Sequence, residues 1–169
     1  MIRSARIKAM KPASGHVDHP DGKLGHPQNF CFACGPDNPD GMKLQFSLDE
    51  AAHLAICHFT IDRRYQGPPK HAHGGIIATI LDEAMGKVNK LRNVIGLTKN
   101  MQIQYLKPIP LEKPLTVTAR EQQVTGREHT NAADITNAQG ELLARGTATF
   151  VIIDPERMFK KLSQAAENG

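Results

Sequence analysis

One segment of the chain has helical spacing, and every other patterned segment alternates like a β-strand. From Gly75 to about Leu91, the apolar residues fall within one arc of a helix at about 100° per residue: Ile76, Ile77, Ile80, Leu81, Ala84, Val88 and Leu91. Asn93 and Gly96 are expected to end this helix. Alternating segments precede and follow it at residues 42–48, 53–61, 97–106, 114–125, 129–138 and 141–153. A single helix offers only one crossover, so the pattern predicts an α+β fold in which an antiparallel sheet of about six strands wraps around one long central helix.

The length and the two ends suggest one domain with flanking segments. The 169 residues suit a single core. Residues 1–28 are rich in Lys, His, Gly and Pro, which predicts a flexible basic N-terminal arm before a domain at 29–154. The arm is interpreted as a solvated tail; its basic, acid-free start leaves an organelle presequence as the alternative. Residues 155–169 are expected to form a short helix and tail, with Asp154 as the cap and Pro155 at the first position.

Composition argues against nucleic-acid and membrane partners. Trp is absent and only eight aromatic residues occur, so base stacking is poorly supplied, and a net charge of +4 suits a small anionic ligand better than DNA. No apolar run approaches the roughly 20 residues that span a bilayer. The three cysteines form an odd number without export features, which favours a cytoplasmic location.

The helix face opposite the apolar arc carries small residues around one carboxylate. A solvated face would carry Lys, Glu and Arg, whereas this one consists of Gly75, Ala78, Thr79, Asp82, Gly86 and Asn89, with Met85 at its margin. Small residues permit close approach of another backbone, so a second subunit or a substrate is expected to pack there. A surface helix that tolerates glycine is the alternative. Glu83, at the edge of the apolar arc, is assigned to a surface or salt-bridge role.

His73, Gly74 and Gly75 lead into the same helix. The unpaired amides of a helix N-terminus carry partial positive charge and can hold the oxyanion that develops when a thioester carbonyl is attacked. Asp82 lies seven residues beyond Gly75, about 10 Å along the axis, whereas reacting groups must lie within about 3.5 Å. Two antiparallel copies of the helix would bring each Asp82 to the other's N-terminus. This geometry predicts a site at a dimer interface.

The run HAHGGIIATILDEAMG at residues 71–86 closely resembles the motif of hotdog-fold acyl-CoA thioesterases of the PaaI-like group. The resemblance continues through LTKNMQIQYLKP at 97–108, includes QGPP at 66–69 and, with the opening CFACGPDNPDGMKLQF, spans about residues 30–153. It implies an antiparallel sheet around a central helix, assembled into homodimers or homotetramers. It also implies hydrolysis of acyl-CoA to free acid and CoA, with no metal or organic cofactor.

The same resemblance implies roles for individual residues. Asp82 corresponds to the catalytic carboxylate, acting as general base or nucleophile, and Gly74 or Gly75 supplies the oxyanion amide. His73 shapes the turn and the site, and Thr98 stands where related enzymes place Ser or Thr near the attacking water. The plainer alternatives are a structural carboxylate for Asp82, a backbone hydrogen bond for His73 and an ordinary strand position for Thr98.

A second group of residues is assigned to substrate binding. Some family members have Asn where this chain has Gln66 and Gly67, and Gln66 is a candidate for a similar amide directed at the carbonyl. Basic residues near strand ends are candidates for the CoA phosphates, although such residues are often simply solvated. The substrate-binding set is Gln66, Gly67, Lys99, Asn100 and Lys107, and Lys70, Arg127 and Arg145 are further phosphate candidates.

Cys31 and Cys34 form a C-x-x-C followed by Gly35, which is half of a zinc-knuckle pattern. A structural zinc needs four ligands, and no spacing demands that Cys57, His58, His71 or His73 complete the set. Free thiols that pack a turn are therefore preferred, and no metal ligand is assigned.

Two other functions remain open on the same fold. One is a non-catalytic module that binds or senses acyl-CoA, against which Asp82 argues. The other is dehydration of a hydroxyacyl thioester, which usually needs a His paired with a carboxylate. Acyl-chain preference and the choice between dimer and tetramer depend on packing between subunits.

Overall fold

The computed structural model describes residues 29–154 and Arg157. The predicted N-terminal arm, and the predicted C-terminal helix and tail apart from Arg157, lie outside these residues. The expected capping contact is present, because the Asp154 carboxylate accepts a hydrogen bond from the Arg157 amide at 3.2 Å. Within the described residues, no helix is long and apolar enough to cross a membrane.

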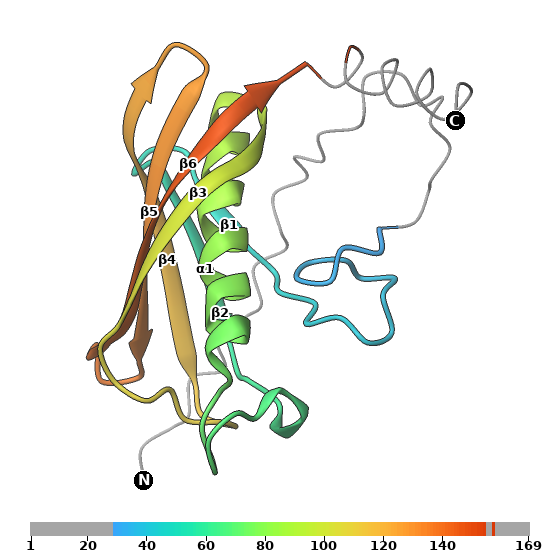
Figure 1. Ribbon diagram of the computed structural model, residues 1–169, viewed down its shortest axis with the longest axis vertical. Coiled ribbons are helices and arrows are strands. Elements are labelled where there is room, and N and C mark those ends of the chain that lie inside the picture. Colours follow the sequence, from blue (N-terminus) through green and yellow to red (C-terminus); the bar gives the residue numbers. More distant parts are fainter. Residues whose placement is uncertain (1–28, 155–156, 158–169) are drawn as a thin grey trace, which may run out of the picture.

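Six antiparallel strands and one long helix make up the domain, as the sequence predicts (Figure 1). The elements are β1 (Ser47–Asp49), β2 (Leu54–Phe59), the 3-10 helix η1 (Arg63–Tyr65), α1 (Gly74–Val88), the 3-10 helix η2 (Asn89–Arg92), β3 (Ile95–Tyr105), β4 (Leu115–Thr125), β5 (Glu128–Asn137) and β6 (Leu142–Ile153). The sheet order is β1-β2-β4-β5-β6-β3, and every neighbouring pair is antiparallel. Because α1 separates β2 from β3, it carries the chain from one side of the sheet to the opposite edge.

The core lies between α1 and the sheet. The predicted apolar arc is confirmed: Ile77, Ile80, Leu81, Ala84 and Val88 are buried, while Ile76 and Leu91 are partly buried against them. Met85, expected at the margin of the opposite face, is fully buried. Burying each of the large aliphatic side chains contributes roughly 1.5–3 kcal/mol, so this face fixes how α1 lies on the sheet.

Two predicted boundaries are wrong. The strand expected at 42–48 is reduced to β1, because the amides of Met42 and Leu44 donate to the carbonyls of Phe32 and Ala33, at 2.8 and 2.9 Å, instead of pairing in the sheet. Gly96 does not end the helix but lies in β3, where a Cβ would come within 2.9 Å of the Phe150 Cβ. Asn93 does end the helical segment, in the left-handed conformation (φ 54°).

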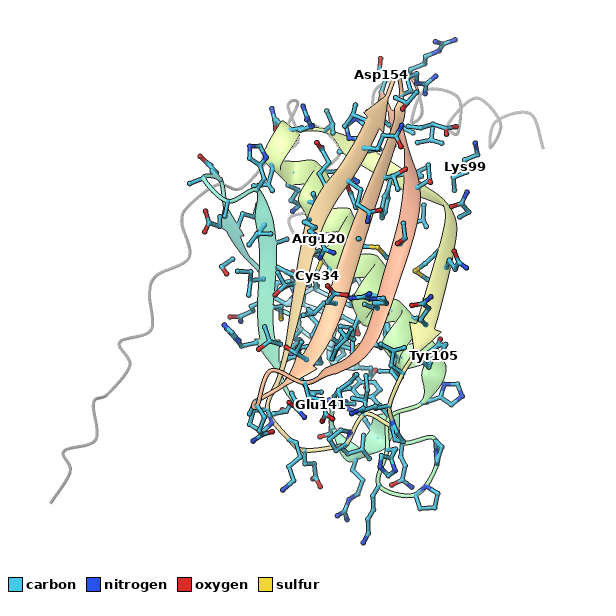
Figure 2. All side chains as sticks on the ribbon, turned by 90° about the vertical axis from the view of Figure 1, so that its left-hand side faces the viewer. Cys34, Lys99, Tyr105, Arg120, Glu141 and Asp154 are labelled. Carbon is cyan, nitrogen blue, oxygen red and sulfur yellow. The ribbon has the colours of Figure 1, made fainter. Side chains whose placement is uncertain are left out.

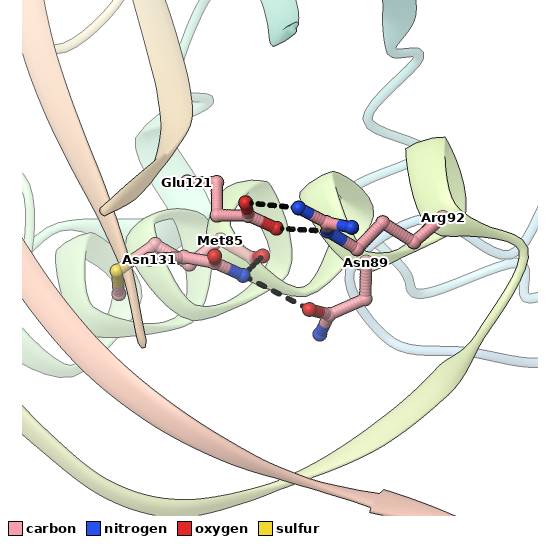
Figure 3. Close-up of polar contacts among 5 residues, drawn as sticks. All are labelled: Met85, Asn89, Arg92, Glu121 and Asn131. Atoms are coloured by element: carbon pink, nitrogen blue, oxygen red, sulfur yellow. Dashed lines mark hydrogen bonds and ion pairs between the residues drawn. The ribbon is translucent and has the colours of Figure 1, made fainter. Parts of the chain in front are cut away.

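Asn89 was expected on the uncovered face of the helix but is buried at its C-terminal end. Asn131 of β5, which is completely buried, donates from Nδ2 to the Met85 carbonyl at 2.8 Å and to Asn89 Oδ1 at 3.1 Å (Figure 3). The backbone N–H of Asn89 donates to the carbonyls of Gly86 and Lys87. The Met85 carbonyl therefore accepts its hydrogen bond from a side chain of the sheet. Carbonyls in the last turn of a helix lack intrahelical partners, and Asn131 satisfies one of them inside the core.

The segment 29–44 covers part of the outer surface of α1. It lies beside the helix on the side away from the sheet (Figure 1), and Ala33 and Leu44 are buried there. Glu83 and Lys87 face this segment and pair with each other at 2.8 Å, which confirms the salt-bridge role expected for Glu83. The small residues Gly75, Ala78 and Thr79, together with Asp82, stay at least partly accessible.

Candidate active site

His73 caps the N-terminus of α1. Its backbone is extended (φ −67°, ψ 139°), and its Nδ1 accepts a hydrogen bond from the Gly75 amide at 3.0 Å. As the acceptor, Nδ1 of His73 carries no proton, as in the Nε2–H tautomer. The His73 carbonyl accepts from Ile76 and Ile77. Of the two glycines predicted to supply an oxyanion donor, Gly75 is already engaged by His73, whereas no acceptor for the Gly74 amide occurs within the described part of the chain.

Tyr105 lies against this helix end and was not predicted as a site residue. Its hydroxyl donates to the Gly74 carbonyl at 3.2 Å, and a Cβ at Gly74 would lie 3.8 Å from its ring. In the sequence, its signals are its place near the end of an alternating strand and within the family-like run at 97–108.

Gln66 and Gly67 support the turn that carries His73. A Cβ at Gly67 would come within 2.8 Å of the His73 Cα, so this close approach requires glycine. Gln66 Oε1 accepts from the Lys70 amide at 3.2 Å. These two predicted substrate contacts therefore lie at the N-terminal end of α1, near His73 and Gly74.

Asp82 and Thr98 form the second half of the candidate site. The Thr98 hydroxyl donates to Asp82 Oδ1 at 2.8 Å, and the Asp82 side chain is half-buried on α1. Thr98 immediately precedes a break in the β3–β6 register between Thr98 and Asn100, which leaves Lys99 as the additional residue of a bulge. Such bulges redirect side chains and are common next to functional sites.

The predicted phosphate contacts are not brought together. Lys99 pairs with Glu128 at 2.6 Å, and Lys107 pairs with Glu141. Figure 2 shows Lys99 and Glu141 toward opposite ends of the sheet. Asn100 is exposed beside the bulge.

One group among the described residues offers three metal-type donors, and it differs from the set considered from the sequence. Cys31, Cys34 and Glu83 place their donor atoms within 4.8 Å of one another. Cys57 is not part of this group; it is buried in the core, and burial raises the pKa of its thiol to about 11.

The two halves of the candidate site are separated within one chain. Gly74 and Asp82 are eight residues apart on α1, or roughly 12 Å along its axis. Gly74 contacts Tyr105, whereas Asp82 contacts Thr98. A single copy of the helix therefore does not bring the free amide and the carboxylate to one substrate carbonyl.

Among the described residues, no strand covers the edge of the sheet beside Asp82. β3 spans 11 residues, and within residues 29–154 it pairs only with β6. Ile95, Leu97, Tyr105 and Leu106 expose apolar surface along or next to this edge, and Leu97 is 51% exposed. Long edge strands with exposed apolar side chains are prone to pair with another chain.

Residues 69–144 match the family model of the thioesterase superfamily. Acyl-coenzyme A thioesterase THEM4 of Rattus norvegicus is 30% identical over 121 residues, which cover 70% of this chain and 52% of the rat protein. The chain thus spans about half the length of that relative.

Two solved structures have the same architecture. Protein RHA08564, described as a thioesterase superfamily protein, has a TM-score of 0.69 and 32% identity over 73% of this chain and 60% of its own. A hypothetical thioesterase of Streptococcus pneumoniae TIGR4 with coenzyme A has a TM-score of 0.60 and 22% identity over 64% of this chain and 87% of its own. Two single variants of the streptococcal protein have also been crystallised. One has alanine in place of an aspartate, and the other has alanine in place of a threonine 16 positions further along. Because the family model, these likenesses and the six-stranded antiparallel sheet around one helix agree with the resemblance seen in the sequence, the segment 69–144 belongs to the thioesterase superfamily, and the described domain has its hotdog fold.

Proposed function

We propose that this protein hydrolyses acyl-CoA thioesters to free acid and CoA, at a site that two copies of α1 complete. The proposal rests mainly on the half-buried Asp82, whose Oδ1 accepts a hydrogen bond from the Thr98 hydroxyl at 2.8 Å. Asp82 lies on the partly accessible helix face that also carries Gly75, Ala78 and Thr79. The name of the rat relative and the CoA-bound streptococcal structure support the substrate class. In the streptococcal protein, the aspartate and threonine changed to alanine have the same separation, 16 residues, as Asp82 and Thr98.

The chemistry follows from the free groups. Thr98 occupies Asp82 Oδ1, which leaves Oδ2 to accept a proton from a water molecule. That water attacks the thioester carbonyl, and the Gly74 amide of the other subunit stabilises the resulting oxyanion at the positive end of its helix. The C–S bond then breaks, and the CoA sulfur leaves as a thiolate that takes up the proton held by Asp82, which restores the carboxylate.

The assembly is a homodimer, or a homotetramer built from such dimers. An open β3 edge with exposed Leu97 lies beside Thr98, and antiparallel docking there would bring the N-terminus of one α1 toward Asp82 of the other. Gln66, Gly67, Lys99, Asn100 and Lys107 remain the proposed substrate contacts. CoA phosphates would have to draw Lys99 and Lys107 away from Glu128 and Glu141, which costs little because these ion pairs are exposed.

The test is free-thiol release across a panel of acyl-CoAs, measured for the wild type and for Asp82→Asn. The amide keeps the acceptor for Thr98 but cannot accept a proton, so kcat is expected to fall about 10²–10⁴-fold while the melting temperature stays near the wild-type value. Asp49→Asn, on β1 at the other edge of the sheet, is the matched control and should keep full activity. Full activity in Asp82→Asn would refute the role of Asp82. Acyl-CoA binding without thiol release in the wild type would instead support a non-catalytic binding module.

A further inference from the structure

A cysteine pair on the outer side of α1 is not used in the proposed hydrolysis. Cys31 and Cys34 lie in the segment that covers the helix, and their sulfur atoms and a Glu83 carboxylate oxygen lie within 4.8 Å of one another. The Cys31 thiol lies 3.8 Å from Glu83 Oε2. Lys87 Nζ contacts both Cys34 Sγ, at 3.1 Å, and Glu83 Oε1, at 2.8 Å.

The backbone around the two cysteines forms a single helical turn. The Gly35 amide donates to the Cys31 carbonyl at 2.8 Å, which is the i to i+4 bond of such a turn. A Cβ at Gly35 would come within 2.6 Å of backbone atoms of Asn29 and Cys31, so the turn closes only with glycine there. Residues three apart on a helical turn have Cβ atoms about 5–6 Å apart, and a disulfide needs about 3.5–4.5 Å. A small adjustment of this surface turn is enough to join the two sulfur atoms.

Cys31 and Cys34 differ in exposure. Cys31 is exposed, so a small oxidant can reach it, whereas Cys34 is half-buried. Burial, together with the neighbouring Glu83 carboxylate, raises the pKa of the Cys34 thiol to about 11 despite the opposing effect of Lys87. Cys34 is therefore a thiol at neutral pH and needs a base before it can react as a nucleophile.

Glu83 is placed to act as that base. Burial alone would raise the pKa of its carboxyl, but hydrogen bonds with Cys34 and Lys87 outweigh burial and hold the pKa below the ordinary value. The group is thus a carboxylate at neutral pH, adjacent to both thiols.

We propose that Cys31 and Cys34 form a redox-active dithiol that hydrogen peroxide oxidises to an intramolecular disulfide, with Glu83 as the proton acceptor for Cys34. The Cys31 sulfur attacks one peroxide oxygen, the O–O bond breaks, and the second oxygen leaves as water, which yields a sulfenic acid on Cys31. Cys34 then passes its proton to Glu83 and attacks the Cys31 sulfur; the S–O bond breaks, and the hydroxide leaves as water with the proton from Glu83. Two thiols lose two electrons in total and reduce one peroxide to two waters.

Lys87 argues for a dithiol rather than a metal site. Its ammonium group already lies against Cys34 and Glu83 and supplies the positive charge that a bound cation would provide. Within the described residues, only three donor groups gather here, whereas structural zinc takes four.

The experiment treats the reduced full-length protein with hydrogen peroxide and follows intact mass and non-reducing peptide maps. We expect a loss of two hydrogen masses and a cross-link between Cys31 and Cys34, both reversed by a thiol reductant. Cys57→Ser is the matched control and should form the same cross-link. Cys34→Ser should stop at a Cys31 sulfenic acid that dimedone traps. Glu83→Gln should close the disulfide at least about tenfold more slowly, with sulfenic acid accumulating.

Three results would overturn the proposal: no Cys31–Cys34 cross-link at peroxide concentrations that oxidise Cys31, an unchanged rate of closure in Glu83→Gln, or zinc bound in equimolar amount to the protein as purified. The readout is mass and metal content, so the outcome does not depend on whether the protein hydrolyses acyl-CoA.

Discussion

Gly74 stands at the first position of α1 with an amide that no described residue accepts. Its carbonyl accepts a hydrogen bond from the Tyr105 hydroxyl, and a Cβ at this position would lie 3.8 Å from the Tyr105 ring, an ordinary van der Waals distance. His73 before it has an extended backbone, which is the conformation that proline requires of its predecessor. These conditions allow the amide to be removed without disturbing the helix.

We predict that Gly74→Pro lowers kcat about 10²–10³-fold, because proline fits the first helical position but has no N–H to donate to the oxyanion. Gly74→Ala retains the amide and should stay within a few-fold of wild type. Thiol release measures the activity, and circular dichroism checks that the helix is intact. Equal activity of the proline and alanine variants would show that another group holds the oxyanion.

Glu83 makes stability depend on pH in a defined direction. Despite burial, its hydrogen bonds with Cys34 and Lys87 hold its folded-state pKa below the ordinary 4.5. A carboxyl with a lowered folded-state pKa stabilises the fold above its unfolded-state pKa, and this stabilisation is lost as the pH falls through the folded-state value.

We therefore predict that, from about pH 5 downward, the free energy of unfolding decreases more steeply for the wild type than for Glu83→Gln. Urea denaturation at several pH values measures the difference, and the two curves should converge at low pH. Parallel curves over the whole range would mean that the pairing with Lys87 does not contribute to stability.

At the scale of elements, the C-terminal end of α1 depends on a side chain from the sheet. Asn131 of β5 satisfies the Met85 carbonyl and the Asn89 side chain inside the core. On the adjoining side, η2 is held by a bidentate pair between Arg92 and Glu121 of β4, at 2.5 and 2.7 Å (Figure 3). Helix and sheet are thus joined by polar contacts beyond the apolar core.

We predict that Asn131→Leu lowers the free energy of unfolding by about 1–3 kcal/mol, because the Met85 carbonyl and Asn89 are left buried without their donor. Gln123→Leu, at an exposed position of β4, is the control and should change it by less than about 0.5 kcal/mol. Urea denaturation measures both. If the free energy of unfolding is unchanged in Asn131→Leu, apolar packing compensates for the lost hydrogen bonds.

At the scale of the whole molecule, the proposed site requires two chains. One half, with Gly74 and His73, and the other half, with Asp82 and Thr98, lie on different parts of one helix. In a two-fold dimer with antiparallel helices, each site takes one half from each subunit.

Mixing two inactive variants tests this arrangement. When Asp82→Asn and Gly74→Pro subunits are dissociated and reassociated in equal amounts, half of the dimers are hybrids, and each hybrid has one intact site. About a quarter of wild-type activity is therefore expected to return. If each subunit holds a complete site, the mixture stays inactive. Analytical ultracentrifugation of each variant confirms that it still associates.

Much of the fold could be predicted because it depends on local periodicity. The helix face from Ile77 to Val88 and the order of two strands, one helix and four strands follow from spacings of 3.6 and 2 residues. The boundaries that failed depend on distant partners. Met42 and Leu44 alternate like strand residues, but their amides donate to the carbonyls of Phe32 and Ala33. Gly96 lies so close to Phe150 that a side chain at this position would clash.

The candidate site divides in the same way. His73, Gly74 and Asp82 follow from a helix N-terminus and a carboxylate on an otherwise small-residue face. The pairing of Tyr105 with Gly74, and of Thr98 with Asp82 across 16 residues, depends on where β3 lies against α1. From the sequence, the possible further ligands beside Cys31 and Cys34 were Cys57, His58, His71 and His73, whereas the chain path places Glu83 and Lys87 there.

The sequence by itself determined the kind of fold, the length and buried face of its helix, and the family, because each is encoded in residues that lie close together along the chain. Only the tertiary structure decided that Gly75 is engaged by His73 while the Gly74 amide has no acceptor among the described residues, that Asn131 and Asn89 meet inside the core, and that the segment 29–44 covers Glu83 and Lys87. These contacts join residues from different elements or depend on how one turn closes. Their geometry is set by the packing of the whole domain, which short-range spacing does not encode.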